Sequence, residues 1–191
     1  ASLKDLLRTR TLEQVRGDAL ATSAIARQLM ASVSRPLDSR WQLSMDARYS
    51  AVGALPAVGD FEATPATGAQ YGLSGLLTGS NLYSTRDINT FSVSYLTTPM
   101  FKGAQLSYSN LTGLRGEVLT LEPSLRFYTQ NSTDGVKTQR ITPGLRLSYK
   151  YSSRTSLLGE TIVERSKTDG PLNHDSSTSV FFYVGYRYEL F

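Results

Sequence analysis

Bulky apolar residues alternate with polar or small residues along most of this chain of 191 residues. The alternation is cleanest between Trp41 and Ser50, where every second residue is apolar: Trp41, Leu43, Met45, Ala47 and Tyr49. Successive side chains of a β-strand point to opposite faces, so a period of two predicts a strand with one apolar and one polar face. The last twelve residues, 180–191, repeat the pattern and end on Phe191.

The same period recurs in segments that are separated by turn-forming residues. In chain order, the expected strands are 41–50, 71–79, 88–97, 104–108, 119–127, 139–151, 156–165 and 180–191. A soluble sheet can bury an apolar face in a core, but lipid around a closed barrel explains better why almost every strand has such a face. The pattern therefore predicts an all-β protein of the antiparallel transmembrane β-barrel class.

The segments between the expected strands predict which connections share an end of the barrel. With Phe191 at the periplasmic end, the outer connections fall near 51–69, 98–102, 130–136 and 166–176. The periplasmic connections fall near 35–40, 80–87, 110–116 and 152–155. The first and last outer segments are long, as is usual for the outer loops of bacterial barrels.

The first residues of the chain have a different period. Helical spacing relates Leu3, Leu6, Leu7, Leu12 and Val15, which predicts an amphipathic helix over residues 2–16. We expect a helical segment or plug at 1–19, followed by the barrel at 20–191.

Residues 20–34 are compatible with two structures. Their Ala, Arg, Gln, Leu and Met residues are good helix formers. Alternation of Leu29, Ala31 and Val33 instead indicates a ninth strand, which the turn-forming residues 35–39 would join to the strand at Trp41. We favour the strand.

The strand count leaves two interpretations of the whole barrel. Eight strands form a complete barrel with a helical amino-terminal extension. Nine strands make the chain the carboxyl-terminal part of a larger barrel, because bacterial single-chain barrels normally have an even number of strands.

Two prolines, Pro123 and Pro143, fall in the middle of expected strands. Proline has no N–H to donate to a β-ladder, and a closed barrel has no edge strand on which the loss would be harmless. We expect a bulge or a local break at each proline.

Composition excludes several classes of function. The chain has no cysteine, which removes disulfides, thiolate catalysis and zinc–cysteine sites. Its net charge of +4 comes from scattered lysines and arginines, which gives nucleic-acid binding little support. No run of about 18 apolar residues indicates a transmembrane helix. We expect no metal and no cofactor, because no metal-ligand cluster or glycine-rich phosphate loop is present.

Charged residues fall on the polar sides of the expected strands, which face the lumen in a barrel. The expected lumen-facing charges are Asp46, Arg48, Glu122, Arg126, Arg140, Arg146, Lys150, Glu160, Glu164, Arg187 and Glu189. In a narrow barrel they pair as structural ion pairs, whereas in a wider barrel they line a wet pore and set its selectivity.

Catalytic chemistry has few candidates. The single histidine, His174, has hydroxyl and carboxyl neighbours within residues 173–177 on an expected outer loop. Catalytic triads need their three groups to converge on one atom, which neighbours in sequence seldom do. Glu160 and Glu164 lie roughly 13 Å apart on one strand at about 3.3 Å per residue, beyond the roughly 9.5 Å range of paired glycosidase carboxylates. We expect no enzyme activity.

The stretch from Ser34-Arg-Pro-Leu-Asp-Ser-Arg-Trp-Gln42 to Phe181-Phe-Tyr-Val-Gly-Tyr-Arg-Tyr-Glu-Leu-Phe191 resembles the membrane-embedded end of bacterial outer-membrane proteins with periplasmic tetratricopeptide repeats. Some relatives of that kind secrete exopolysaccharides. In such proteins the terminal aromatic residue is a signal to the barrel-assembly machinery. The resemblance implies this role for Phe191, with Tyr188 as an alternating apolar partner.

The leading hypothesis is an outer-membrane barrel that acts as an export conduit, with exopolysaccharide as the cargo that the resemblance implies. The first alternative is a plugged barrel that serves as a membrane anchor or as a surface module for adhesion or phage attachment, through loops 51–69 and 166–176. The second is an outer-membrane lipid-modifying enzyme. Expected partners are outer-membrane lipid, lipopolysaccharide, the barrel-assembly machinery, and a periplasmic repeat domain or export partners.

Overall fold

The computed structural model describes residues 26–54, 63, 65–116, 118–171 and 174–188. These contain nine strands: β1 (Ala26–Pro36), β2 (Trp41–Val52), β3 (Gly68–Ser80), β4 (Asp87–Thr97), β5 (Phe101–Leu114), β6 (Leu119–Ser132), β7 (Lys137–Lys150), β8 (Thr155–Asp169) and β9 (His174–Tyr188). The all-β prediction is confirmed, and so is the ninth strand before Trp41. The expected helix at 2–16, within the segment 1–19, lies outside the described residues.

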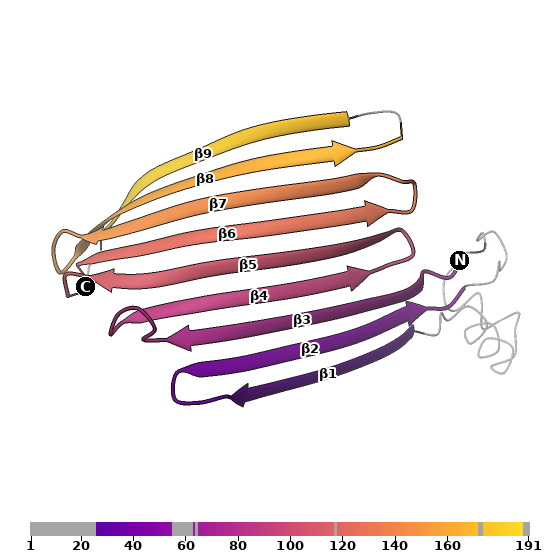
Figure 1. Cartoon of the computed structure of the whole chain (residues 1–191), viewed down its shortest axis with the longest axis horizontal. Helices are drawn as coiled ribbons and strands as arrows, with labels where there is room; N and C mark the ends of the chain where they lie inside the picture. The colour runs from indigo at the N-terminus through magenta and orange to yellow at the C-terminus, as the bar shows by residue number, and fades with distance from the viewer. Residues whose placement is uncertain (1–25, 55–62, 64, 117, 172–173, 189–191) are drawn as a thin grey trace, which may run out of the picture.

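The nine strands form one sheet in which each strand pairs antiparallel with the next one along the chain (Figure 1). The connections therefore alternate between two ends of the sheet. We call the end where β1 begins the Ala26 end and the end where β9 finishes the Tyr188 end. The connections at the Tyr188 end are 37–40, 81–86, 115–118 and 151–154, and the others lie at the Ala26 end.

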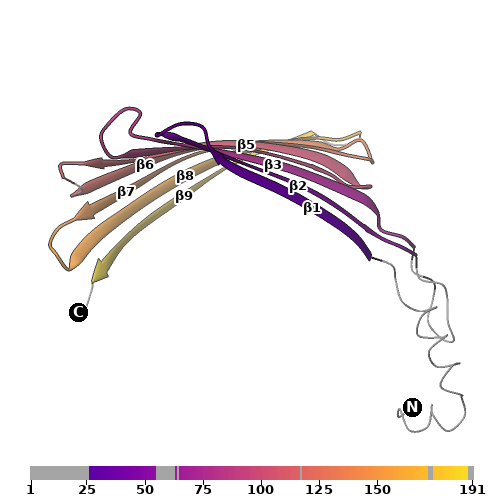
Figure 2. The same cartoon turned by 90° about the horizontal axis from the view of Figure 1, so that it is seen from below.

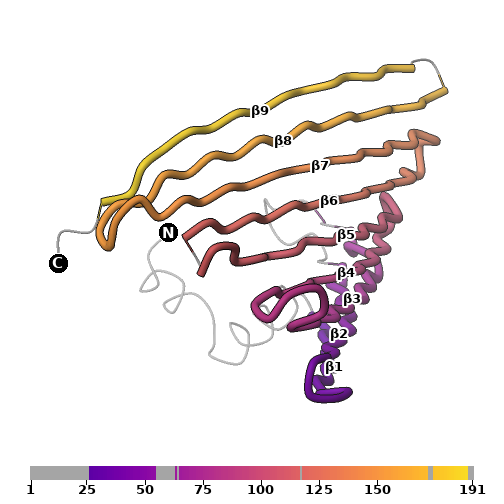
Figure 3. The backbone as a smooth tube through the Cα atoms, turned by 60° about the vertical axis from the view of Figure 1, so that its left-hand side comes forward, coloured from indigo at the N-terminus to yellow at the C-terminus, as the bar shows by residue number. Residues whose placement is uncertain are grey.

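The sheet is twisted and curved, as the right-handed twist of β-strands requires (Figure 2). Figure 3 shows that the sheet bends along its width, so that the flank with β1 and the flank with β9 lie at an angle to each other. These two edge strands do not pair with each other in the described part of the chain. Both run from the Ala26 end to the Tyr188 end, so β1 and β9 have the same direction.

The two faces of the sheet differ in polarity. Residues directly opposed in an antiparallel pair have side chains on the same face, so the strand register assigns every strand residue to a face. On the apolar face, Leu73, Leu106 and Val184 are 51%, 55% and 65% exposed. Among the described residues, no hydrophobic side chain is buried. The described sheet has no hydrophobic core and no layer that covers its apolar face.

Pro123 and Pro143 both lie within continuous strands. Pro123 pairs with Leu145 of β7, and Pro143 pairs with Leu125 of β6. Pairing is skipped on the other side of each proline, between β5 and β6 and between β7 and β8, and it resumes after two residues of both strands. The local break is present, but because both strands lose the same number of residues there is no bulge.

A buried polar cluster holds the connection 81–86 against the apolar face at the Tyr188 end. Asp87 accepts hydrogen bonds from the backbone N–H groups of residues 82–84 at 2.8, 3.0 and 3.3 Å, and from Asn89 Nδ2 at 2.7 Å. Asn89 Oδ1 accepts from Tyr108 Oη at 2.9 Å and from Asn110 Nδ2 at 2.8 Å. Asp87 and Asn89 are fully buried. Every buried side-chain polar atom in the described residues has a partner.

Candidate functional site

One row of side chains crosses the polar face from edge to edge. Each member directly opposes the next in the strand register, from β1 to β9. The row consists of Ser32, Asp46, Ser74, Ser94, Gln105, Tyr128, Arg140, Ser166 and Ser177. Opposed side chains lie about 5 Å apart, so the row is a continuous track of hydrogen-bonding groups.

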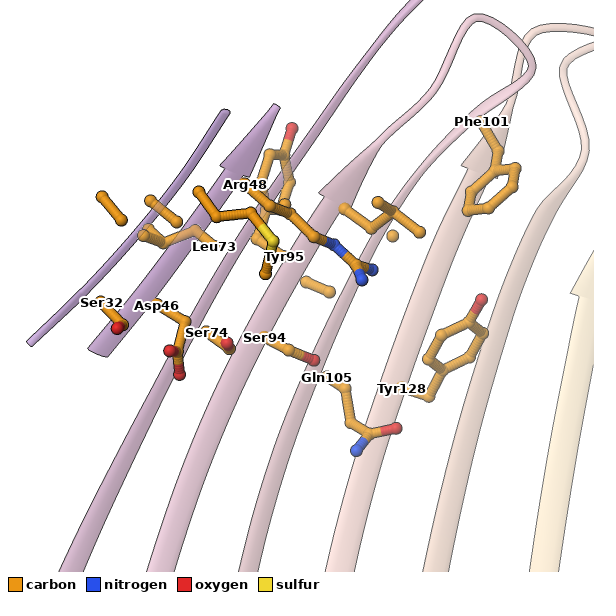
Figure 4. Close-up of a pocket in the computed structure, with 17 residues that line it drawn as sticks. Ser32, Asp46, Arg48, Leu73, Ser74, Ser94, Tyr95, Phe101, Gln105 and Tyr128 are labelled. Atoms are coloured by element: carbon orange, nitrogen blue, oxygen red, sulfur yellow. The ribbon is translucent and has the colours of Figure 1, made fainter. Parts of the chain in front are cut away.

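A pocket lies over the first six strands along this row (Figure 4). Ser32, Asp46, Ser74, Ser94, Gln105 and Tyr128 line it in succession, and Phe101 lies at its rim toward the Ala26 end. Figure 4 shows Arg48 extending across the neighbouring strand. Arg48 directly opposes Gly72, where an added Cβ would lie 2.7 Å from Arg48 Nε. The glycine thus leaves room for the guanidinium to lie across β3.

Neutral groups dominate the polar face over β1–β5. Hydroxyls pair directly across strands, with 2.9 Å between the Oγ atoms of Ser34 and Ser44 and 2.6 Å between those of Ser92 and Ser107. The ionisable side chains on this part of the polar face, among the described residues, are Asp46 and Arg48. This part of the face offers hydroxyl and amide groups rather than charge.

Ionic groups dominate the polar face over β6–β8. Arg146 directly opposes Glu122 on one side and Glu160 on the other, and its Nη1 lies 4.0 Å from Glu122 Oε2. Arg140 Nε lies 3.3 Å from Glu164 Oε1. These side chains are about half exposed, so each ion pair contributes less than about 1 kcal/mol to stability.

Arg140 of β7 contacts an aromatic residue at the edge of the ionic half. The guanidinium carbon of Arg140 lies 6.0 Å from the ring centroid of Tyr128, within the range of a cation–π interaction. Tyr128 Oη in turn hydrogen-bonds Gln130 Oε1, and Gln130 Nε2 donates to Ser132 Oγ at 3.2 Å. Tyr128 directly opposes Gln105 of β5, so this chain of contacts lies next to the neutral half.

Ten of the eleven charges expected to face the lumen share the polar face by register. They are Asp46, Arg48, Glu122, Arg126, Arg140, Arg146, Lys150, Glu160, Glu164 and Arg187. Glu189 lies outside the described residues. That the shared face lines a lumen stays a prediction.

The expected assembly signal is only partly described. Tyr188 is the last described residue and lies on the apolar face, where it is 54% exposed. Phe191 lies outside the described residues. The recognition role of both residues stays a prediction.

His174 lies at the Ala26 end of the sheet, where β8 connects to β9. Its Nδ1 lies 2.9 Å from Asp169 Oδ1, and Lys167 Nζ lies 2.9 Å from the other oxygen of the same carboxylate. Asp169 is the last residue of β8, and the hydrogen bonds from Lys167 and His174 lower its pKa below the ordinary value of 3.8. Ser177 belongs to the polar row, so it lies on the opposite face from this carboxylate.

Sequence reasoning did not identify Gln105 and Tyr128 as site residues. Neither is charged, whereas every residue expected to face the lumen is. Their place in the row depends on the register of β5 against its two neighbours, which periodicity along one strand does not determine. The serines at alternate positions were the available signal, because they mark the face that avoids apolar contact.

Among the described residues, no group of three or more His, Cys, Asp or Glu side chains could hold a metal ion. No helix in the described part of the chain is long and apolar enough to cross a membrane. Comparison of the sequence with protein-family models and with curated proteins finds no match.

Proposed function

We propose that the nine strands form part of the wall of an outer-membrane β-barrel that serves as an export conduit. The apolar face contacts lipid, and the polar face lines an aqueous passage. No catalytic step, metal or cofactor is part of this proposal.

The observation that carries the proposal is the uncovered apolar face. Large apolar side chains such as Val93, Phe182 and Tyr186 are 54%, 69% and 77% exposed. A folded sheet normally packs such a face against a second layer, and contiguous apolar patches of more than a few hundred Å² mark interaction surfaces. Hydrocarbon tails satisfy every strand of the sheet at once, whereas a protein partner would need a matching face across all nine.

Strand length is suited to this environment. β8 and β9 each have 15 residues, or about 50 Å at about 3.4 Å per residue. A tilt of about 45° leaves roughly 35 Å along the membrane normal, which exceeds the apolar band of about 25 Å in such barrels. Aromatic residues lie near both ends of the strands: Tyr49 and Tyr71, with rings 5.1 Å apart, toward the Ala26 end and Trp41 and Tyr186 toward the Tyr188 end. Amphipathic rings favour the two membrane interfaces.

The polar face supports the conduit because it repeats the same kinds of hydrogen-bonding group from strand to strand. The row of hydroxyl, amide and phenol groups offers successive hydrogen bonds to a polyhydroxylated chain. Conduction requires that sites be favourable enough to enter and weak enough to leave. The choice of exopolysaccharide as cargo rests on the resemblance to repeat-bearing outer-membrane proteins.

Planar-bilayer recording of the full chain tests the conduit. We expect ion conductance. A double variant R140Q/R146Q should shift the reversal potential in the direction of greater cation selectivity, because it leaves Glu122 and Glu164 without their partners. R35Q, which changes a cation on the apolar face, is the matched control and should leave selectivity unchanged. A protein that stays monodisperse in buffer without detergent, or that inserts without conducting, would contradict the proposal.

One observation favours a second candidate, the plugged barrel that acts as an anchor or surface module. Arg146 lies between Glu122 and Glu160 in a row across three strands, an arrangement that also fills the interior of a narrow barrel. In that case the inserted protein does not conduct, and replacing the connection 170–173 between β8 and β9 with a short glycine–serine linker abolishes attachment of a surface partner without affecting insertion.

A further inference from the structure

Cations on the apolar face are concentrated at one end. The strand register puts Lys102 of β5, Lys137 of β7 and Arg165 and Lys167 of β8 on this face, all toward the Ala26 end. At the Tyr188 end of the described strands, the corresponding cation on this face is Arg35. The apolar face thus has a basic margin at the Ala26 end that has no counterpart at the other end.

A groove runs across the apolar face next to this margin. Its floor is a row of directly opposed side chains on β4–β7, namely Val93, Leu106, Phe127 and Ile141, and the next residue in the row, on β8, is Arg165. The neighbouring row toward the Ala26 end contains the smaller Ala104 and Thr129, and it reaches Lys167 on β8 through Gln139. The small residues leave the hollow, and the two cations close it at one end.

The charges at this end of the groove do not cancel. Lys167 pairs with Asp169, whose carboxylate also accepts from His174. Lys137 directly opposes Asp169. Arg165 has no ion-pair partner in the described part of the chain. Lys137, Arg165 and Lys167 therefore share this end of the groove with one carboxylate, that of Asp169. The guanidinium of Arg165 remains available to an external anion.

We propose that this groove binds one lipid with an anionic phosphate headgroup, drawn from the membrane leaflet at the Ala26 end. The acyl chain lies over Phe127 and Ile141, and the phosphate lies between Arg165 and Lys167. This inference rests on the proposed membrane insertion and deepens it, since it names a residue-level lipid site. Charge complementarity selects the occupant: an apolar floor that ends in paired cations matches an amphiphile with an anionic head, and the guanidinium offers a bidentate contact to phosphate.

Brominated lipids provide the test, because bromine quenches a tryptophan only at short range. The chain has one tryptophan, Trp41, which lies at the Tyr188 end of β2 and reports insertion in the native protein. A second protein, W41F/F127W, has its tryptophan in the groove floor and reports occupancy. Both are reconstituted in phosphatidylcholine vesicles that contain a minor fraction of brominated phosphatidylglycerol or of brominated phosphatidylcholine.

The expected result is a stronger quenching of the groove tryptophan by brominated phosphatidylglycerol than by brominated phosphatidylcholine, with no such preference at Trp41. Either R165Q or K167Q, added to the groove reporter, should reduce the preference for brominated phosphatidylglycerol about fivefold. This factor corresponds to about 1 kcal/mol per basic residue near an anionic lipid surface. R35Q is the matched control and should leave the preference unchanged. Raised salt should weaken the preference because it screens the charges.

The outcomes separate this inference from the proposed function. Equal quenching of the groove tryptophan by both lipids overturns the lipid site but leaves membrane insertion intact. Quenching of Trp41 without any quenching of the groove tryptophan also overturns the lipid site. It would show that a second copy of the chain or another protein covers the groove. Absence of quenching at both positions overturns the proposed membrane insertion itself.

Discussion

Gly79 packs beneath the indole of Trp41, its directly opposed neighbour on β2. A Cβ at Gly79 would lie 2.7 Å from the Trp41 ring and 2.8 Å from Leu82 Cδ1. The absence of a side chain therefore lets an aromatic ring and the connection 81–86 approach the same strand. We expect G79A to displace both.

The G79A variant should lose about 1–3 kcal/mol of stability, the usual cost of overpacking, and its tryptophan emission should shift to the red. Urea unfolding in detergent, followed through the fluorescence of Trp41, measures both effects. G159A is the matched control, because a Cβ at Gly159 would have no atom within 4 Å. Equal behaviour of the two variants would show that the close packing at Gly79 has no energetic consequence.

Asn89 is the centre of the buried polar cluster, because its amide is bonded both to Asp87 and to Tyr108 and Asn110. N89L would leave several buried polar groups unpaired, at about 1–3 kcal/mol each. We expect a loss of at least about 2 kcal/mol and, by hydrogen exchange, faster opening of the connection 81–86. N131L removes an exposed asparagine and should change neither quantity.

At the scale of the element, the hairpin β8–β9 is tied at its connection by Asp169, which bonds both Lys167 and His174. Those two partners lower the pKa of Asp169. A carboxyl group whose pKa is lower in the folded state stabilises that state at pH values above its unfolded pKa, and the stabilisation is lost as pH falls through the folded pKa.

Amide protection at the 170–173 end of this hairpin should accordingly be greater in the native protein than in D169N at neutral pH. The difference should disappear in acid, once the native carboxyl is protonated as well. Hydrogen exchange of both proteins at matched pH measures it, with D175N, a change on the polar face, as the control. A difference that persists in acid would show that the carboxylate charge is not the cause.

The strands show how far sequence determines this fold. Alternation alone predicted β2 from Trp41 onward, because each of its residues repeats the pattern without interruption. It underestimated β5, expected at 104–108 and found at Phe101–Leu114, because Asn110 and Thr112 put polar groups on the apolar face. Those groups are satisfied by Asn89 and by each other, which is a contact between strands that periodicity along one strand cannot predict.

The candidate site, like the strands, could be predicted from the sequence only in part. The alternation within single strands was enough to put Arg140 and Arg146 on a polar face. Which side chains oppose one another depends on register, so the row that joins Gln105 to Tyr128 and Arg140 became visible only in the sheet. The groove that ends at Arg165 likewise combines five strands, and no single segment of the chain contains its pattern.

At the scale of the whole molecule, the parallel direction of β1 and β9 constrains how the proposed barrel wall could close. If these edges paired directly, the joint would be the single parallel pair in an otherwise antiparallel sheet. Bacterial barrels close with antiparallel pairs, and that closure needs an odd number of further strands between the edges. We therefore predict that β1 and β9 are not neighbours in the assembled wall.

Cysteine cross-linking can test this cleanly because the chain contains no native cysteine. V33C combined in turn with V180C, F182C or V184C should form no disulfide within one chain in the folded protein. V33C with M45C, two directly opposed residues of β1 and β2, is the positive control and should cross-link readily. Efficient cross-linking between β1 and β9 would mean that the sheet closes on itself.

The separation of the polar face into a neutral half and an ionic half also has a consequence for the proposed conduit. In the proposed conduit, ion pairs line one flank and hydroxyls line the other, so the local electric field is strong on one side of the passage and weak on the opposite side. A dipolar solute would be turned by that field before it moved forward. Such a passage would sort molecules by how their polar groups are distributed around the long axis, in addition to their size and net charge.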